Sequence, residues 1–281
     1  QEYDWDGYLE IVRELAPEAV IFSDKGDVRW IGNEDGLAAE TCWSLFDPST
    51  VEIGGGTQEQ MGVGNLEGDT WAPAECDVSI RPGWFYHSKE DSQVKSLSHL
   101  LDIYYRSVGH NCCLHLNVPP DRRGLLHEND VARLKEFNRA VSENFKTNLA
   151  AGKKCTASSV RGNFSEFAAS NVTDGDRKTY WALDDGKTEG TIEIDLGEPL
   201  TFDLVLLQEY IELGQRISAY HLDAWDAKSS EWKEIAKGTT IGYKWILRVP
   251  ETTTHKVRLV IEKARACPTL SSFELYKSTY K

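Results

Sequence analysis

The hydrophobic periodicity changes near residue 148, and this change constrains the fold more than any other feature of the sequence. Before it, strand-length apolar runs alternate with helix-length amphipathic stretches. After it, short segments of alternating apolar and polar residues follow one another between turn residues. The first pattern is typical of a parallel sheet and the second of a β-sandwich. We therefore predict two domains, residues 1–148 and residues 149–281.

The first domain is predicted to contain helices and strands in alternation. Apolar positions recur at helical spacing in residues 6–16, 94–109 and 127–145. Strand-length runs lie at residues 19–24, 40–46, 76–80 and 112–118. The first run is continuously apolar, which favours a strand buried on both faces. A complete eight-unit barrel takes about 250 residues, so this domain is predicted to be the C-terminal half of a (β/α)8-like barrel.

The second domain resembles a known sandwich type. The stretches "ASSVRG" (157–162), "ASNVTDGDRKTYWA" (169–182) and "LGQRISAYHL" (213–222) are similar to the galactose-binding-like sandwich. That resemblance implies a jelly-roll fold of a carbohydrate-binding kind. Its tryptophans could line a sugar site, although aromatic packing in the core is the favoured alternative; they are Trp181, Trp225, Trp232 and Trp245.

Charge and hydropathy exclude several classes of partner. The formal net charge of −14 argues against nucleic acid and against an anionic membrane surface. No apolar run is long enough for a membrane helix. Residues 1–10 lack the basic start and apolar core of a signal peptide, so we expect a removed or more upstream signal. The sequons at Asn163 and Asn171 favour a secretory route.

The six cysteines give no metal motif. No C-x-x-C pair and no zinc-like Cys/His spacing occurs, so no metal site is expected. The neighbouring Cys112 and Cys113 lie in an apolar run, which favours buried free thiols. Cys155 and Cys267 lie near the two ends of the second domain, and we predict that they form a disulfide.

One loop presents an acid directly after the apolar run at residues 19–24. In "DVRWIGNEDG" (27–36), Glu34 lies between Trp30 and Gly36. Three long stretches, "PEAVIFSDKGDVRWIGNEDGLAAETCWS", "WAPAECDVSIRPGWFYH" and "LLDIYYRSVGHNCCLHLNVPPDRRGLL", resemble the plant α-L-fucosidases of glycoside hydrolase family 29. The resemblance runs over essentially the whole chain. It implies a retaining hydrolase of terminal α-linked fucose, without a cofactor, in which a sandwich follows the catalytic barrel.

The resemblance also implies a role for Glu34. In the matching subgroup, the Glu of the "GNE" loop is the general acid/base, and the subgroup acts on α1,3/α1,4-linked fucose. Retention needs a second carboxyl group about 5–5.5 Å away. The family's nucleophilic Asp lies in a segment absent from this chain. We expect the apolar setting beside Trp30 to raise the pKa of Glu34, and Gly32 and Gly36 to bring the acid close to the sugar.

A second cluster is expected to bind the sugar. By the resemblance, Arg81 supplies donors for ring hydroxyls and Trp84 an aromatic plate, with Glu75 and His87 as further candidates. The alternative is that Trp84 is core and Arg81 a structural ion pair. We interpret Asp24 as a carboxylate that orients Arg29 or the Glu34 loop.

These expectations name the partners of the chain. The substrate would be a fucosylated oligosaccharide or glycoprotein glycan, and a separate N-terminal barrel-half polypeptide would supply the nucleophile. The location would be the apoplast, the cell wall or the vacuole. Because one carboxylate cannot perform double displacement, the alternative is a non-catalytic, lectin-like glycan-binding protein derived from a fucosidase.

Overall fold

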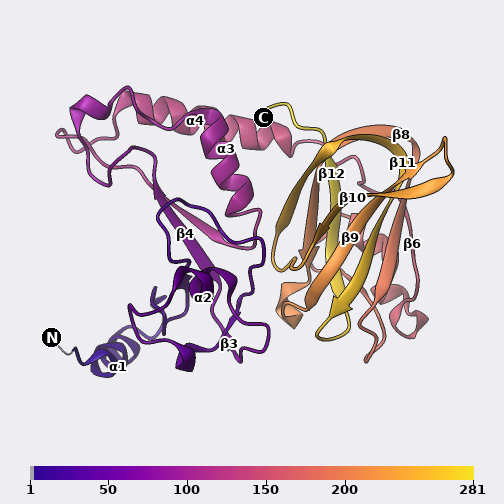
Figure 1. The fold of residues 1–281 in the computed structure, drawn as a ribbon, viewed down its shortest axis with the longest axis horizontal. Coiled ribbons are helices and arrows are strands. Elements are labelled where there is room, and N and C mark those ends of the chain that lie inside the picture. Colours follow the sequence, from indigo (N-terminus) through magenta and orange to yellow (C-terminus); the bar gives the residue numbers. More distant parts are fainter. Residues whose placement is uncertain (1–2) are drawn as a thin grey trace.

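The computed structural model describes residues 3–281 and consists of an α/β part followed by a β-sandwich (Figure 1). The elements of the α/β part are α1 (Trp5–Leu15), β1 (Arg29–Trp30), β2 (Leu45–Phe46), α2 (Gln58–Val63), β3 (Thr70–Trp71), β4 (Ala74–Ser79), α3 (Leu97–Arg106), β5 (Cys113–Asn117) and α4 (Glu128–Asn144). Strands β1, β4 and β5 form a parallel sheet in that order. The predicted α/β class is therefore confirmed.

The two long helices beside this sheet form where the sequence predicts them. Ser96 caps α3 by accepting a hydrogen bond from the His99 amide, and the buried side chains of α3 include Leu100 and Ile103. His127 caps α4 in the same manner. Both helices present an apolar stripe to the core, which explains why helical periodicity located them within a few residues.

Two strand predictions are wrong. Residues 19–24 form no strand; the segment has only an isolated bridge between Phe22 and Val28, and Val20 is 71% exposed. Within residues 3–281 no further strand lies beside it, so its backbone groups have no ladder to join. Residues 40–46 contribute only β2, which pairs antiparallel with β3 outside the parallel sheet.

The sandwich contains seven antiparallel strands. They are β6 (Lys154–Ala157), β7 (Trp181–Ala182), β8 (Gly190–Glu209), β9 (Ile217–Asp226), β10 (Glu231–Gly238), β11 (Trp245–Ala264) and β12 (Thr269–Tyr276). Their order is β10-β9-β11-β8-β12-β7, and β6 also pairs with β8. Irregular register lets the long strands β8 and β11 bend, so each covers two strands expected from the sequence. The jelly-roll prediction is confirmed.

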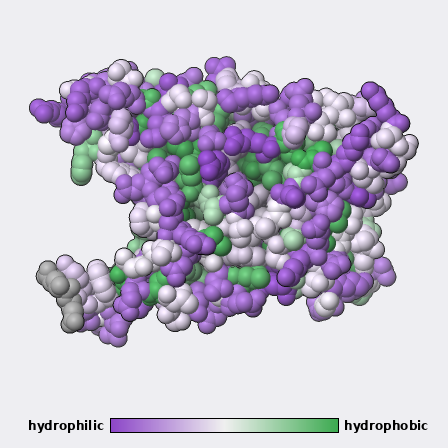
Figure 2. All heavy atoms as spheres, in the orientation of Figure 1, coloured by the Kyte–Doolittle hydropathy of each residue, from purple (hydrophilic) through white to green (hydrophobic). Residues whose placement is uncertain are grey.

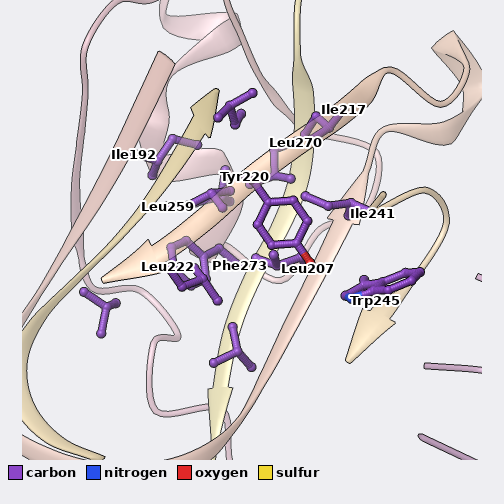
Figure 3. Close-up of a cluster of buried hydrophobic side chains, with 14 of the residues drawn as sticks. Ile192, Leu207, Ile217, Tyr220, Leu222, Ile241, Trp245, Leu259, Leu270 and Phe273 are labelled. Carbon is purple, nitrogen blue, oxygen red and sulfur yellow. The ribbon is translucent and has the colours of Figure 1, made fainter. Parts of the chain in front are cut away.

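The sandwich core is built from inward-facing residues of several strands (Figure 3). Leu222 of β9, Leu259 of β11 and Phe273 of β12 are all at most 1% exposed. Tyr220 and Trp245 extend this core toward the α/β part. Close packing of this kind accounts for most of the sandwich's stability.

The apolar core continues across the junction of the two parts. The His110 ring stacks on Trp245 with centroids 4.4 Å apart and an interplanar angle of 7°. The Cys42 amide donates to Thr240 Oγ1 over 3.0 Å. In Figure 2 hydrophobic atoms are visible in the hollow between the two parts, and hydrophilic atoms surround it. Helix α4 ends at Asn144 and β6 begins at Lys154, but the division at residue 148 stays a prediction.

Helix α1 differs from the other helices because none of its side chains is buried. Its apolar residues nevertheless share one face, and several are exposed: Trp5 43%, Tyr8 53%, Ile11 55% and Leu15 77%. This helix is the end of the chain marked N in Figure 1 and lies at the side of the α/β part away from the sandwich. No helix within residues 3–281 has the length and apolar character needed to cross a membrane.

Candidate active site

The loop after β1 is fixed by two glycines. Gly32 and Gly36 have φ values of 82° and 74°, which residues with a Cβ rarely adopt. A Cβ at Gly36 would lie 2.7 Å from Val78 Cγ1, and one at Gly32 would lie 2.7 Å from Gln58 Cα. The glycines therefore let the loop pack closely against Val78 and Gln58, and the expected approach of the acid to a sugar stays a prediction.

This loop presents Glu34 to solvent beside an aromatic side chain. Glu34 is exposed, and its Oε2 accepts a hydrogen bond from Trp84 Nε1 over 2.8 Å. Trp84 comes from the loop after β4, about fifty residues later in the chain. The structure thus brings together two residues that the sequence analysis assigned to one site. The indole N–H holds the carboxylate in one orientation at the edge of the sheet.

A second tryptophan–carboxylate pair lies next to it. Trp30 Nε1 donates to Asp77 Oδ1 over 2.5 Å. A hollow of about 500 Å³ lies beside this pair, and one of its walls includes α1. Its lining includes Trp30, Asp77, Glu34 and Asp24. The sequence analysis missed Asp77. Its position two residues after Glu75 on β4 was the available signal, because alternate residues of a strand share a face.

Asp24 is bound by a backbone amide rather than by Arg29. Its Oδ2 accepts a hydrogen bond from the Gly54 amide over 2.8 Å. Arg29 instead donates to backbone carbonyl groups and is fully buried. The first alternative, that Asp24 orients Arg29, is therefore wrong. The second, that it orients the Glu34 loop, stays a prediction, and Asp24 does line the hollow with Glu34.

The same face of the parallel sheet carries further polar side chains. Glu75 Oε1 lies 3.1 Å from His115 Nδ1 of β5. Glu75 is half-buried and His115 is exposed. His87 is also exposed, and among the described residues its side chain makes no hydrogen bond with Glu34, Trp30 or Trp84. Glu75 therefore shares the face of β4 that carries Asp77, and neither Glu75 nor His87 is among the described residues that line the hollow.

Arg81 belongs to a buried ion-pair network. Its side chain has no exposed surface; Nε lies 2.9 Å from Asp130 Oδ2 and Nη1 lies 3.0 Å from Asp91 Oδ1. Its guanidinium also lies 4.9 Å from the centroid of the Tyr86 ring. A guanidinium held in this way cannot reach a sugar hydroxyl. Of the two alternatives left open by the sequence, the structural ion pair is the one present for Arg81.

The tryptophans of the sandwich pack into the fold. Trp181 and Trp245 are 0% and 2% exposed. Trp225 and Trp232 meet edge to face with centroids 5.3 Å apart, and Arg258 lies over Trp232. Trp181 and Trp245 thus match the core-packing alternative that the sequence analysis favoured, whereas Trp225 and Trp232 are half-buried and Trp225 lines a surface hollow.

The predicted disulfide is absent. Cys155 and Cys267 are both free. Cys155 Sγ contacts Thr173 Oγ1 over 3.4 Å, whereas Cys267 Sγ lies 3.0 Å from the Arg216 guanidinium. The two sulfurs therefore occupy different surroundings, so the pairing of Cys155 with Cys267 is wrong. The positions of the two cysteines near the ends of the domain did not suffice to predict a disulfide, because a disulfide requires that the two Cβ atoms lie next to each other.

The two sequon asparagines differ in accessibility. Asn163 is exposed in a turn with φ 55°. The Asn171 side-chain amide donates to the backbone oxygens of Glu166 and Tyr180 over 2.8 and 3.0 Å. Glycosylation and secretion stay predictions. Within residues 3–281 no group of three or more potential metal ligands is placed to hold an ion.

Comparison with known proteins assigns both parts. Residues 49–145 match the family model described as alpha-L-fucosidase, and residues 154–274 match that of the F5/8 type C domain. Alpha-L-fucosidase 1 of Arabidopsis thaliana is 41% identical over 282 residues, covering 99% of this chain and 55% of the relative. A putative alpha-L-fucosidase 1 of Oryza sativa subsp. japonica is 42% identical, covering 99% of this chain and 54% of the relative.

A solved structure extends the likeness to three dimensions. The GH29 fucosidase of Ruminococcus gnavus, determined in complex with fucose, superimposes with a TM-score of 0.90 at 35% identity. The match covers 99% of this chain and 58% of that one. Fold and sequence thus define a glycoside-hydrolase α/β part joined to an F5/8 type C sandwich. The α/β part therefore contains a domain of the alpha-L-fucosidase (GH29) family, and the chain spans about half the length of the curated relatives it matches.

Proposed function

We propose that the protein is a retaining α-L-fucosidase in which Glu34 is the general acid/base. The observation that carries the proposal is the Glu34–Trp84 hydrogen bond of 2.8 Å at the mouth of the carboxylate-lined hollow. A retaining glycosidase needs one carboxyl group that protonates the leaving oxygen and later deprotonates water. Glu34 is exposed to an incoming glycan, and Trp84 fixes its orientation.

The proposed substrate is a glycan with terminal α-linked fucose. Its support is family membership together with the fucose bound in the Ruminococcus gnavus relative. We extend the proposal to α1,3- and α1,4-linked fucose, which the "GNE" loop around Glu34 suggests. Trp30 offers the hollow an aromatic surface of the kind that packs against the apolar face of a sugar.

The nucleophile is proposed to come from a companion segment that completes the sheet. Within the described residues, β1 and β5 are the two edges of a three-stranded parallel sheet, and such sheets are normally covered and continued. The exposed apolar face of α1 offers a further contact surface. The rest of the length of the relatives could supply both the missing strands and the second carboxylate.

Replacement of Glu34 by Gln in the intact protein tests the assignment. Loss of a general acid typically costs about 10²- to 10⁴-fold, so natural glycans should be hydrolysed that much more slowly. Aryl fucosides with good leaving groups should be affected far less, because their departure needs little protonation. Added azide should partly restore turnover of the aryl fucoside, since a small anion needs no general base.

Asp35→Asn is the matched control, because Asp35 is a neighbouring exposed carboxylate that does not line the hollow. It should behave as wild type on both substrates. Equal losses on both substrates in Glu34→Gln, without an azide effect, would assign the acid/base role to another residue. Binding of fucosylated glycans without any turnover in the wild-type protein would favour the lectin-like alternative.

A further inference from the structure

Three cysteines gather in the core behind the candidate site. Cys42 follows the Glu34 loop, Cys76 lies on β4 and Cys112 directly precedes β5. Their side chains belong to the same buried apolar cluster, with exposed fractions of 0%, 0% and 8%. Because strand residues alternate, Cys76 faces away from the side that carries Glu75 and Asp77. The cluster is therefore separate from the polar face of the sheet.

Two of these sulfurs are in direct contact. Cys42 Sγ and Cys112 Sγ lie 3.4 Å apart, although the residues are 70 positions apart in the chain. Both cysteines are free. A separation this short requires only a small side-chain adjustment to reach bonding distance, which is about 2.05 Å. The contact with Cys42 lowers the pKa of the Cys112 thiol, but the third thiol, Cys76, and burial outweigh it and raise that pKa well above its usual value.

A buried cation faces the same cluster. Arg29 is fully buried, and its guanidinium donates to the carbonyl oxygens of Met61 and Trp43 over 2.8 and 2.5 Å. Its Nη2 lies 3.9 Å from Cys42 Sγ. Among the ion pairs formed by residues 3–281, none joins a carboxylate to Arg29. The contact with Cys112 and burial nevertheless raise the pKa of the Cys42 thiol well above its usual value, and the Arg29 charge only partly opposes this shift.

We propose that Cys42 and Cys112 form a structural disulfide when the protein folds in an oxidising compartment. The oxidant is a disulfide, R–S–S–R, such as glutathione disulfide. The Cys112 thiolate, the less deeply buried of the two, attacks one sulfur of R–S–S–R and releases one thiolate, RS⁻. The Cys42 thiolate then attacks the Cys112 sulfur and releases the second RS⁻. Two protein thiols lose two electrons and two protons, and one disulfide is reduced to two thiols.

The cross-link would join two segments that meet at the junction of the two parts. The Cys42 amide donates to Thr240 Oγ1 of the sandwich over 3.0 Å. The neighbouring Asn111 Oδ1 accepts from the Tyr243 amide over 2.7 Å. A covalent bond between Cys42 and Cys112 would fix the end of the Glu34 loop to the start of β5. It would also fix the distance between Cys42 and Asn111, the two residues that hydrogen-bond to the sandwich.

Thiol mapping of the intact Cys113→Ser protein tests the proposal. Removing the exposed Cys113 makes every remaining cysteine assignable after cleavage at Glu and Lys/Arg. The protein is produced by secretion from a eukaryotic host, then denatured and alkylated with iodoacetamide without reductant. The six cysteines minus Cys113 leave five, so a disulfide leaves three alkylated. Cys42 and Cys112 should be the unmodified pair, linked in one cross-linked peptide, and prior reduction should make all five react.

Thermal unfolding supplies the second readout. The oxidised protein should unfold about 5–15 °C above the reduced protein, because a cross-link across a long loop restricts the unfolded chain. The difference should persist in Cys76→Ser and vanish in Cys42→Ser. The proposal is overturned if Cys42 and Cys112 are alkylated without reduction, or if Cys76 occupies the cross-link. Mapping decides the matter even if Cys42→Ser fails to fold.

Discussion

Carboxylates in this chain are held by two kinds of donor, with different consequences. Glu34 and Asp77 each accept one indole N–H at the hollow. Glu209, at the end of β8, is fully enclosed and accepts three backbone N–H groups, from Arg216, Ile217 and Gly242, at 2.7–3.0 Å. The first arrangement leaves a carboxylate available to a ligand, whereas the second ties together the ends of three sandwich segments.

Glu209 is predicted to make stability depend on pH. Burial outweighs the three amide donors and raises the pKa of Glu209 from 4.5 to about 7. Since the folded-state pKa is the higher one, the stabilisation is fully present below about pH 4.5 and is lost as the pH rises through 7. Between pH 5 and pH 8 the wild-type free energy of unfolding should fall by about 2.5 kcal/mol relative to Glu209→Gln.

Denaturant unfolding of both proteins at pH 5, 6, 7 and 8 measures this difference. Glu212→Gln, three residues away on the exposed surface, is the control and should follow the wild type at every pH. A constant difference between wild type and Glu209→Gln would show that Glu209 keeps one protonation state over this range. The amides would then outweigh burial, contrary to the prediction.

The sequence located part of the candidate site at the level of residues. Glu34 was predicted as the acid/base and Trp84 as part of a second, sugar-binding cluster, and the structure joins the two by a hydrogen bond. Asp77 was missed because no motif marked it, although it alternates with Glu75 on β4. Arg81 could not be classified, since its partner Asp130 is distant in the sequence and only the fold brings them together. The catalytic role of Glu34 remains a prediction.

Secondary structure was predicted best for segments whose hydrogen bonds lie within the segment itself, because their hydrophobic periodicity does not depend on a partner strand. Helices α1, α3 and α4 lie close to their predicted bounds. Strand formation at residues 19–24 failed because a strand needs a hydrogen-bonding neighbour, which periodicity does not reveal. The prediction at residues 40–46 located β2 but made it too long, and its antiparallel partner β3 was missed, since each strand has only two residues.

The sandwich is predicted to fold by itself, with reduced stability. Most of its large buried side chains contact one another inside the sandwich, such as Leu207, Leu259 and Phe273. However, Leu206 and Ile246 belong to a cluster shared with Leu101 and Tyr105 of α3. Residues 149–281 expressed alone should therefore unfold cooperatively, but at a lower temperature than in the intact protein.

Calorimetry of residues 149–281 provides the check. Substituting Ile246 by Thr, which suits a surface strand position, should cost the isolated segment less stability than it costs the intact protein, where α3 covers this face. A soluble segment that melts without a transition would contradict the domain boundary near residue 148.

At the scale of the whole molecule, the candidate site is open on the side that α1 borders. The three-stranded parallel sheet has a polar inner face, two edges and an adjacent exposed apolar helix. The predicted half-barrel architecture agrees with these features and with relatives about twice as long. The sequence analysis predicted half a barrel from the number of strands, because a closed barrel needs more strands than residues 1–148 supply, and completion of the sheet by a companion segment stays a proposal.

The central claim is that Glu34 acts with a nucleophile outside residues 1–281, and mechanism-based labelling tests it most directly. An activated 2-fluoro-fucoside traps the glycosyl-enzyme intermediate of a retaining enzyme, because the fluorine slows its hydrolysis. The intact protein is labelled, digested and mapped by mass spectrometry, with excess fucose as the competition control. The account predicts one labelled carboxylate in the companion segment and none in residues 1–281. Label on Asp24, Glu75 or Asp77 would contradict it, because the nucleophile would then belong to this chain.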